Sequence, residues 1–173
     1  MCNHILRMMN YDNAQTLIIA YAASNVVGLL LLWSAYKNTK VARFLFMLLF
    51  IWASWINFTT ARVNPEIYLE YGKQSIDIYS RFINGWFASH ISLFITGIAF
   101  GQGLIALGML LNGKWVTWAS LGAILFLMSI APLGLYAAFP FSITVSMAAF
   151  IILRRDDKAF LWKFFYQKLR SSS

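Results

Sequence analysis

Five stretches of mostly apolar residues, separated by short polar segments, make up most of this chain. They cover residues 15–36, 41–61, 86–111, 115–131 and 135–153. About 20 apolar residues cross a bilayer as a helix, because each residue advances about 1.5 Å and the hydrocarbon core is about 30 Å thick. The pattern predicts an all-α fold, a polytopic membrane helix bundle with five transmembrane helices in a single domain over residues 1–173.

The boundary between the last two stretches depends on the sequence APLG at 131–134. Proline and glycine are typical of a tight turn. Pro140 then falls in the first turns of the fifth helix, where its missing N–H does least harm. The alternative is one long kinked helix followed by a short segment, which gives four spans and puts the C-terminus on the other side of the membrane.

The distribution of charge favours five spans. The side of the membrane that carries the C-terminus then receives ten of the 14 Lys and Arg residues and two of the six acidic residues. Because Lys and Arg near span ends stay in the cytoplasm, we expect the C-terminus in the cytoplasm and the N-terminus outside. The small size and short loops favour a bacterial inner membrane.

Composition excludes several classes of protein. The chain is 60% hydrophobic and 12% charged, whereas a soluble domain is about 45–50% apolar and about 25% charged. The net charge of +8 lies at span ends, where basic residues set orientation, so we expect no nucleic-acid partner. The single cysteine, Cys2, excludes an internal disulfide and a cysteine metal cluster.

Two further segments are predicted to lie on the membrane surface. Residues 64–84 read as an external interfacial helix that begins at Asn64 and Pro65 and is interrupted at Gly72. The basic tail, 154–173, reads as an amphipathic helix on the cytoplasmic leaflet, where it binds anionic lipid. Binding of the tail to a protein partner is the alternative.

Glycines mark one face of the third span. Gly97, Gly101 and Gly108 are separated by four and seven residues, and His90 precedes Gly97 by seven. Steps of four and seven keep nearly the same face of a helix, and small residues let helices approach closely in lipid. We expect this face, including His90, to point into the bundle, and the glycines to pack within the chain or between copies.

Polar residues inside the spans need partners, because an unsatisfied polar group in hydrocarbon is costly. Asn25 and Gln102 lie near mid-membrane, and Asn57 lies near the outer end of its span at the depth of His90. One interpretation is that these groups only bridge helices. The other is an outward-facing polar pocket formed by Asn57, His90 and six residues of the 62–81 segment. These six are Arg62, Asn64, Glu66, Glu70, Asp77 and Arg81.

Few residue patterns point to chemistry. The sequence shows no nucleophile elbow, phosphate-binding glycine loop or spaced metal-ligand set, and no cofactor can be assigned. We therefore predict a non-enzymatic membrane component that binds a lipid or small hydrophobic molecule, or that is a helper subunit of a membrane complex or a homo-oligomer. The alternative is a small membrane enzyme or metal-dependent site at the outer face that uses His90 and a loop carboxylate.

Overall fold

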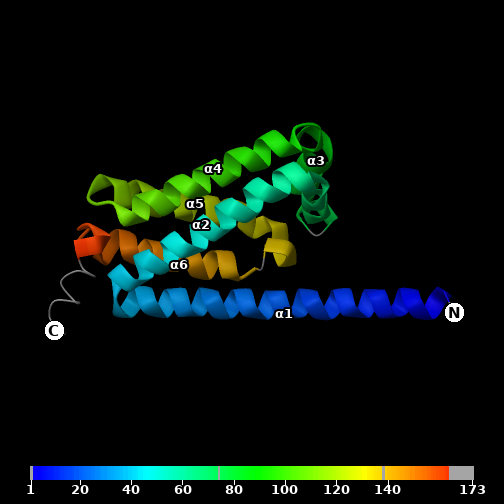
Figure 1. Cartoon of the computed structure of the whole chain (residues 1–173), viewed down its shortest axis with the longest axis horizontal. Coiled ribbons are helices and arrows are strands. Elements are labelled where there is room, and N and C mark those ends of the chain that lie inside the picture. The colour runs from blue at the N-terminus through cyan, green and yellow to red at the C-terminus, as the bar shows by residue number, and fades with distance from the viewer. Residues whose placement is uncertain (1, 74, 138, 164–173) are drawn as a thin grey trace.

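The computed structural model describes residues 2–73, 75–137 and 139–163, which are helical over most of their length (Figure 1). The elements in chain order are α1 (Cys2–Lys37), α2 (Thr39–Val63), the 3-10 helix η1 (Pro65–Lys73), α3 (Asp77–Phe82), the π-helical turn η2 (Ile83–Phe87), α4 (Ile91–Leu110), α5 (Lys114–Ile130), the 3-10 helix η3 (Ala131–Ala137) and α6 (Phe141–Arg155). The described part of the chain therefore confirms the all-α prediction.

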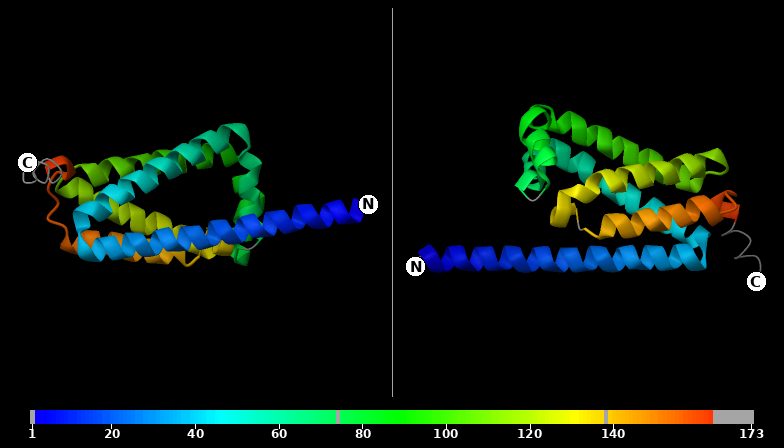
Figure 2. Two further views of the ribbon diagram at one scale, coloured as in Figure 1. Left: turned by 60° about the horizontal axis from the view of Figure 1, so that its bottom comes forward. Right: turned by 180° about the vertical axis from the view of Figure 1, so that it is seen from behind.

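The long helices alternate in direction and form one bundle (Figures 1 and 2). α2 and α4 pack along much of their length, and α6 lies between α1 and α5. The turns after α1 and α4 meet the end of α6 at one end of the bundle, while η1, α3 and η2 cover the opposite end. The N-terminal part of α1 extends past the rest of the bundle.

We call the first of these ends the basic end, because its cations outnumber its acids. Its described cations are Lys37, Lys40, Arg43, Lys114, Arg154, Arg155, Lys158 and Lys163. Its two acidic residues are Asp156 and Asp157. The predicted separation of charge between the two ends is therefore present in the fold.

Among the described residues, four helices, and not the predicted five, are long and apolar enough to cross a membrane. These spans are Ile18–Lys37, Thr39–Val63, Ile91–Leu110 and Lys114–Gly134. α6 has 15 residues, which at about 1.5 Å per residue is shorter than the hydrocarbon core of about 30 Å. The physical reason is that Pro132 and Gly134 end α5 in a 3-10 segment, with Gly134 at a φ of 69°. Residues that were assigned to the fifth span therefore form a connection.

α6 nevertheless runs back toward the basic end, so Asp156 contacts the start of α2. The end of α6 therefore lies at the same end of the bundle as the turns after α1 and α4. The third predicted span also starts late, at Ile91, because the π-helical turn and the non-helical Gly85 interrupt the chain before it.

The structure differs in how far it describes the two predicted surface helices. Residues 64–84 form a 3-10 helix and the short α3 in place of one α-helix, with a break near Gly72 as predicted. Gly72 is buried, and a Cβ there would lie 3.3 Å from Ile83 Cγ2. The tail helix is described only as far as Lys163, where Leu161 is buried. The remaining predicted tail residues, 164–173, lie outside the described residues.

Small residues determine where the helices meet. A Cβ on Gly108 would lie 2.6 Å from Ala119 Cβ, so α4 and α5 approach closely there, as predicted for a packing glycine. A Cβ on Gly97 or Gly101 would meet no atom within 4 Å. These two glycines therefore do not pack within the chain, and the alternative that they pack between copies stays a prediction.

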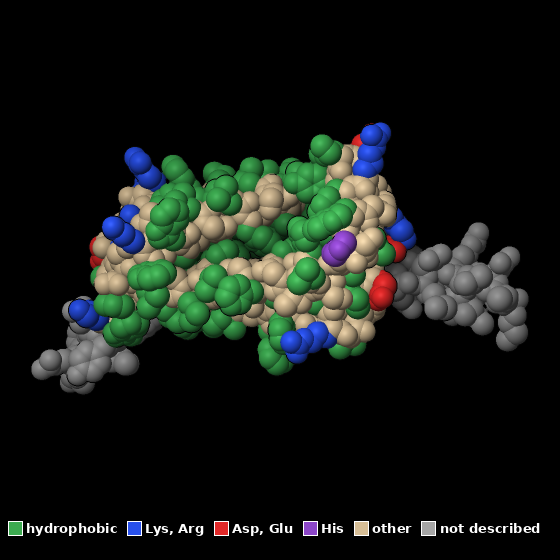
Figure 3. All heavy atoms as spheres, turned by 90° about the horizontal axis from the view of Figure 1, so that it is seen from above, with side chains coloured by type: hydrophobic (Ala, Val, Ile, Leu, Met, Phe, Trp, Pro, Cys, Tyr) green, Lys and Arg blue, Asp and Glu red, His purple; other side chains and the backbone are tan. Residues whose placement is uncertain are grey.

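The outward surface of the bundle is apolar. Large side chains such as Trp52, Leu93, Phe100 and Leu125 are more than half exposed, and hydrophobic side chains cover much of the face in Figure 3. A soluble monomer rarely exposes apolar patches larger than a few hundred Å². This surface is what a helix bundle in lipid requires.

A buried arginine holds the basic end together. The Arg43 side chain on α2 is completely buried, and its guanidinium makes five hydrogen bonds. Nε and Nη2 donate to Met109 O at 3.0 and 2.7 Å, and Nη2 donates to Leu111 O at 2.6 Å. Nη1 donates to Asp156 Oδ1 at 3.0 Å and to Ala159 O at 2.8 Å. All five guanidinium N–H groups thus have an acceptor.

The carboxylate of Asp156 is equally buried and well bonded. It accepts hydrogen bonds from Thr39 Oγ1 at 2.7 Å, Lys40 Nζ at 3.2 Å and the backbone N–H of Lys158 at 2.7 Å, besides Arg43. Asp157 also pairs with Lys40, and this hydrogen bond lowers the pKa of the Asp157 carboxyl. The two acids at this end therefore neutralise Lys40 and Arg43. Sequence analysis counts both among the Lys and Arg residues near span ends on the C-terminal side.

Removing the guanidinium should destabilise the bundle strongly. We expect Arg43→Met to lower the free energy of unfolding by about 3–5 kcal/mol, because it leaves a buried carboxylate short of its main partner. Arg43→Lys should recover little of this, because one ammonium cannot replace a five-donor planar group. Unfolding in mixed detergent micelles, followed by circular dichroism, measures the change.

The matched control is Arg155→Met, which removes an exposed arginine from the same end and should change stability by no more than about 0.5 kcal/mol. The double variant Asp156→Asn and Arg43→Met should lower the free energy of unfolding by less than the sum of the two single changes, because each single change leaves one buried charge without its partner. Strict additivity of the two costs would contradict this account of the cluster.

Candidate functional site

A groove of about 570 Å³ lies between α4 and α5. Its lining residues are Ile98, Gly101, Gln102, Leu104, Ile105, Leu107, Gly108, Leu111, Trp115, Trp118, Ala119, Gly122 and Phe126. The face of the molecule that carries α4 is hollowed along its middle, with hydrophobic side chains inside the hollow and on its borders (Figure 3). Sequence analysis did not predict this groove, although it named three of the lining residues.

Glycines explain why the groove is open at one place and closed at another. Gly108 lets α4 approach α5 at Ala119, where the helices touch. Gly101 lies seven residues, or about two turns, before Gly108. A Cβ added to Gly101 would have no atom within 4 Å. The two helices therefore converge toward the basic end and separate away from it. Trp115, Trp118 and Leu104 are among the residues that border the groove.

The groove covers only part of the membrane span. Its lining residues on α5 run from Trp115 to Phe126, which is about 16 Å at about 1.5 Å per residue. The hydrocarbon core is about 30 Å thick. On α4 the lining runs from Leu111 to Ile98, which is about 20 Å. The groove thus extends from the basic end over about half to two thirds of the spans.

One carboxamide reaches the floor of this apolar groove. Gln102 is 3% exposed, and its Oε1 accepts a hydrogen bond of 2.7 Å from Asn57 Nδ2 on α2. Asn57 Oδ1 in turn accepts a hydrogen bond of 2.6 Å from the Tyr68 hydroxyl on η1. Ser54 Oγ adds a 2.7 Å bond to Ala99 O across the same interface. A hydrogen-bonded chain therefore joins the groove floor to the cap at the opposite end.

The Tyr68 hydroxyl remains a donor under ordinary conditions. Burial raises its pKa above the usual value of 10, because desolvation disfavours the phenolate. Tyr71, which stacks on Tyr68 with ring centroids 5.9 Å apart, has a raised pKa for the same reason. The hydrogen bond from Tyr68 to Asn57 therefore persists across the physiological pH range.

The structure does not bring His90 and Asn57 together. His90 is exposed, its ring stacks on Trp86 with centroids 4.8 Å apart, and its Nδ1 lies 3.1 Å from Trp86 O. The prediction that His90 faces the bundle interior is therefore wrong. It assumed a continuous helix from residue 86, but His90 has φ/ψ of −130°/22°, so it loses its phase with Gly97.

The buried stripe of α4 follows a different set of positions. The buried residues of α4 are Ile95, Ala99, Gln102, Ile105, Ala106, Gly108 and Met109. Five of them, Ile95, Ala99, Gln102, Ala106 and Met109, are separated by four, three, four and three residues, which is the usual period of a helix seam. Gly108 is the one glycine of the predicted stripe among the buried residues. Hydrophobic content alone could not distinguish this stripe from the glycine stripe, since both are apolar at helical spacing.

The six segment residues of the predicted pocket lie at the opposite end, mostly in exposed positions. Glu70 forms an ion pair with Lys73, and the Arg62 guanidinium lies 3.8 Å from the centroid of the Phe58 ring. Asn64, Glu66, Asp77 and Arg81 are exposed. Within the described residues, no group of three His, Cys, Asp or Glu side chains is placed to hold a metal ion.

Asn25 makes a hydrogen bond within its own helix. Its Nδ2 donates a hydrogen bond of 2.9 Å to Tyr21 O on the same helix, and the side chain is half-buried. Asn57 and Gln102 bridge helices, as one interpretation of the intramembrane polar residues predicted.

Comparison with known proteins gives no match: no protein-family model, no curated protein and no solved structure is similar to this chain. The features of the molecule that bear on its function are the four candidate spans, the groove and the hydrogen-bonded chain beneath the groove.

The amide pair under the groove should contribute modestly to stability. We expect Gln102→Leu to lower the free energy of unfolding by about 1 kcal/mol, because the Asn57 amide loses its acceptor in an apolar interface. Asn57→Leu combined with Gln102→Leu should cost less than the sum of the single changes. Unfolding in mixed micelles measures all three variants.

Thr96→Val serves as the control, because the Thr96 hydroxyl bonds only to Ser92 O on its own helix, at 2.6 Å. Its effect should stay within about 0.5 kcal/mol. If the double variant were as unstable as both single variants together, Asn57 and Gln102 would not be acting as a pair.

Proposed function

We propose that this chain is a multi-pass membrane protein that binds a hydrophobic molecule, such as a lipid, in the groove between α4 and α5, and that it carries out no chemistry of its own. The observation that supports this most directly is the groove itself. It has about 570 Å³ of space, within the range of about 300–1,000 Å³ typical of small-molecule sites. Its lining is apolar apart from one amide that is already paired.

The groove is placed where a ligand would enter from the lipid. Leu104, Leu107 and Trp118 line it and are more than half exposed on the outer surface of the bundle. A hydrocarbon chain could therefore move in sideways without crossing a polar barrier. Packing against side chains and a glycine floor would then provide the affinity, since lipid itself supplies no hydrophobic driving force between apolar surfaces.

We also propose that the basic end faces the cytoplasm. Eight cations lie at this end among the described residues, and Asp156 and Asp157 neutralise two of them, Lys40 and Arg43. Six remain, whereas the described cations of the opposite end, Arg62, Lys73 and Arg81, are matched by three acids. The excess of Lys and Arg near span ends supports a cytoplasmic C-terminus and an outside N-terminus.

The alternative function is a helper subunit in a larger complex. A helix of a partner protein, or a second copy of this chain, could pack against Gly97 and Gly101, whose faces are open. The outer-face enzyme has less support, because the described contacts of His90 are with Trp86 and not with a carboxylate.

Filling the groove should abolish ligand retention. Gly101→Leu places a side chain in the groove with no atom within 4 Å of its Cβ, so it should fold. We expect the variant, purified from its native membrane in mild detergent, to lose the apolar molecule that native mass spectrometry detects on the unmodified protein.

Gly97→Leu is the matched control, because Gly97 lies on the same helix, has equally open space and does not line the groove. Both changes remove the same helix penalty of about 1 kcal/mol for glycine. If Gly101→Leu and Gly97→Leu retained the apolar molecule equally, the groove would not be the binding site. If Gly97→Leu and Gly101→Leu both dissociate a complex of larger mass, the glycine face is a protein interface instead.

The orientation can be tested separately. A reporter that is active only in the cytoplasm, fused after Ser173, should be active, because the six unpaired cations keep the basic end inside. Replacing Lys114, Arg154 and Arg155 with Gln should lower that activity in part. Activity of a reporter that works only outside the cell, fused at the same position, would overturn the proposed orientation.

A further inference from the structure

We infer that the groove between α4 and α5 holds one acyl chain of an anionic phospholipid from the leaflet at the basic end, with the headgroup beside Lys114. This inference rests on the proposed function and adds the chemical class of the ligand. It is carried by two observations, the length of the groove and the charge at its closed end.

The length of the groove is closer to one leaflet than to two. The groove extends about 16 Å along α5, from Trp115 to Phe126, and about 20 Å along α4, from Leu111 to Ile98. Half of a hydrocarbon core of about 30 Å is about 15 Å. A molecule that crossed both leaflets would need a groove that continues to the end of α5. An acyl chain that lies in the groove with its headgroup at the basic end would reach the separated part of the two helices, at Gly101, near its terminal methyl group.

The charge at the closed end selects the headgroup. Lys114 begins α5 directly before Trp115, the first lining residue of that helix, and it is exposed. The two acids of the basic end are bonded to Lys40 and Arg43, so among the described residues no carboxylate pairs with Lys114. Each Lys near an anionic lipid surface strengthens attraction about fivefold. Trp115 and Trp118, both more than half exposed, suit the boundary between headgroup and chain.

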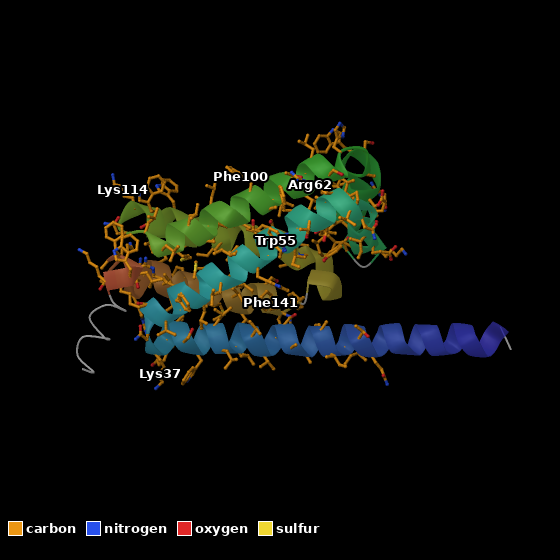
Figure 4. All side chains as sticks on the ribbon, viewed as in Figure 1. Lys37, Trp55, Arg62, Phe100, Lys114 and Phe141 are labelled. Carbon is orange, nitrogen blue, oxygen red and sulfur yellow. The ribbon has the colours of Figure 1, made fainter. Side chains whose placement is uncertain are left out.

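The turn that carries Lys114 is fixed in place. Gly113, at a φ of 52°, donates its N–H to Lys158 O at 2.8 Å, and Arg43 bonds to Leu111 O on the other side of the turn. The lysine therefore extends from a rigid support next to the groove. Lys37 lies at the same end of the bundle but on the opposite side, along α1 (Figure 4).

This arrangement provides a matched pair of lysines. Lys37 and Lys114 are both exposed, both lie at the basic end, and only Lys114 adjoins the groove. The full chain would be reconstituted into vesicles of equimolar phosphatidylglycerol and phosphatidylcholine with identical acyl chains. It would then be extracted in mild detergent, and the retained lipid would be identified by native mass spectrometry.

We expect the unmodified chain to retain phosphatidylglycerol over phosphatidylcholine by about fivefold. Lys114→Gln should reduce this ratio to near one while some lipid of both kinds remains bound, and Lys114→Arg should restore it. Lys37→Gln should leave the ratio unchanged. Gly101→Leu should remove both lipids.

Two results would overturn the inference alone. One is equal retention of the two lipids by the unmodified chain, and the other is an equal loss of preference in Lys37→Gln and Lys114→Gln, which would show a general attraction to the basic end. In either case, loss of both lipids in Gly101→Leu would leave the groove intact as the binding site. Unchanged retention in Gly101→Leu would instead remove the proposed function and this inference together.

Discussion

The ion pair between Arg43 and Asp156 is the interaction on which the arrangement of the bundle depends. A guanidinium and a carboxylate lie next to each other with both side chains fully buried. Moving an ion out of water costs several kcal/mol even after relaxation, so such a pair persists only when every remaining donor and acceptor is bonded. Here Arg43 uses all five N–H groups, and Asp156 accepts four hydrogen bonds. The pair therefore specifies one geometry.

That geometry joins three separate parts of the chain. Arg43 belongs to α2, its acceptors Met109 and Leu111 belong to the end of α4, and Asp156 and Ala159 follow α6. The last carbonyls of a helix lack partners within the helix and carry partial negative charge, so a cation is favourable there. The same turn, on its other side, forms the closed end of the groove at Leu111 and Trp115. One buried cation thus fixes the position of the turn at the closed end of the groove.

The sequence predicts those features that depend on local composition. The lengths of the apolar stretches gave α2 and α5 nearly to the residue, and the proline and glycine of the 131–134 segment marked the end of α5. The burial of Arg43 could not be predicted this way, because an arginine three residues into a span resembles any other charge at the membrane edge. One signal was present. Asp156 and Asp157 are the only acids on the side with ten basic residues, and such a pair is expected to have specific cationic partners.

The candidate site was harder to predict because helical phase and helix approach both depend on tertiary structure. The step from His90 to Gly97 has the spacing of one helix face, but the chain leaves the helical conformation at His90, so the spacing has no meaning there. Gly101 and Gly108 have the same spacing and do share a face, yet only Gly108 meets a partner.

A glycine face on a membrane helix indicates only that a neighbouring group can approach the backbone closely. Whether that is another helix or a lipid chain depends on how far the neighbouring helix is held away. α4 and α5 are held together at the basic end by the Arg43 contacts and by Gly108 on Ala119. At the other end, Tyr79 donates a 2.8 Å hydrogen bond to Ser129 O, which ties α3 to the end of α5. The contacts at the basic end thus close the groove at Gly108, and α4 and α5 are apart at Gly101.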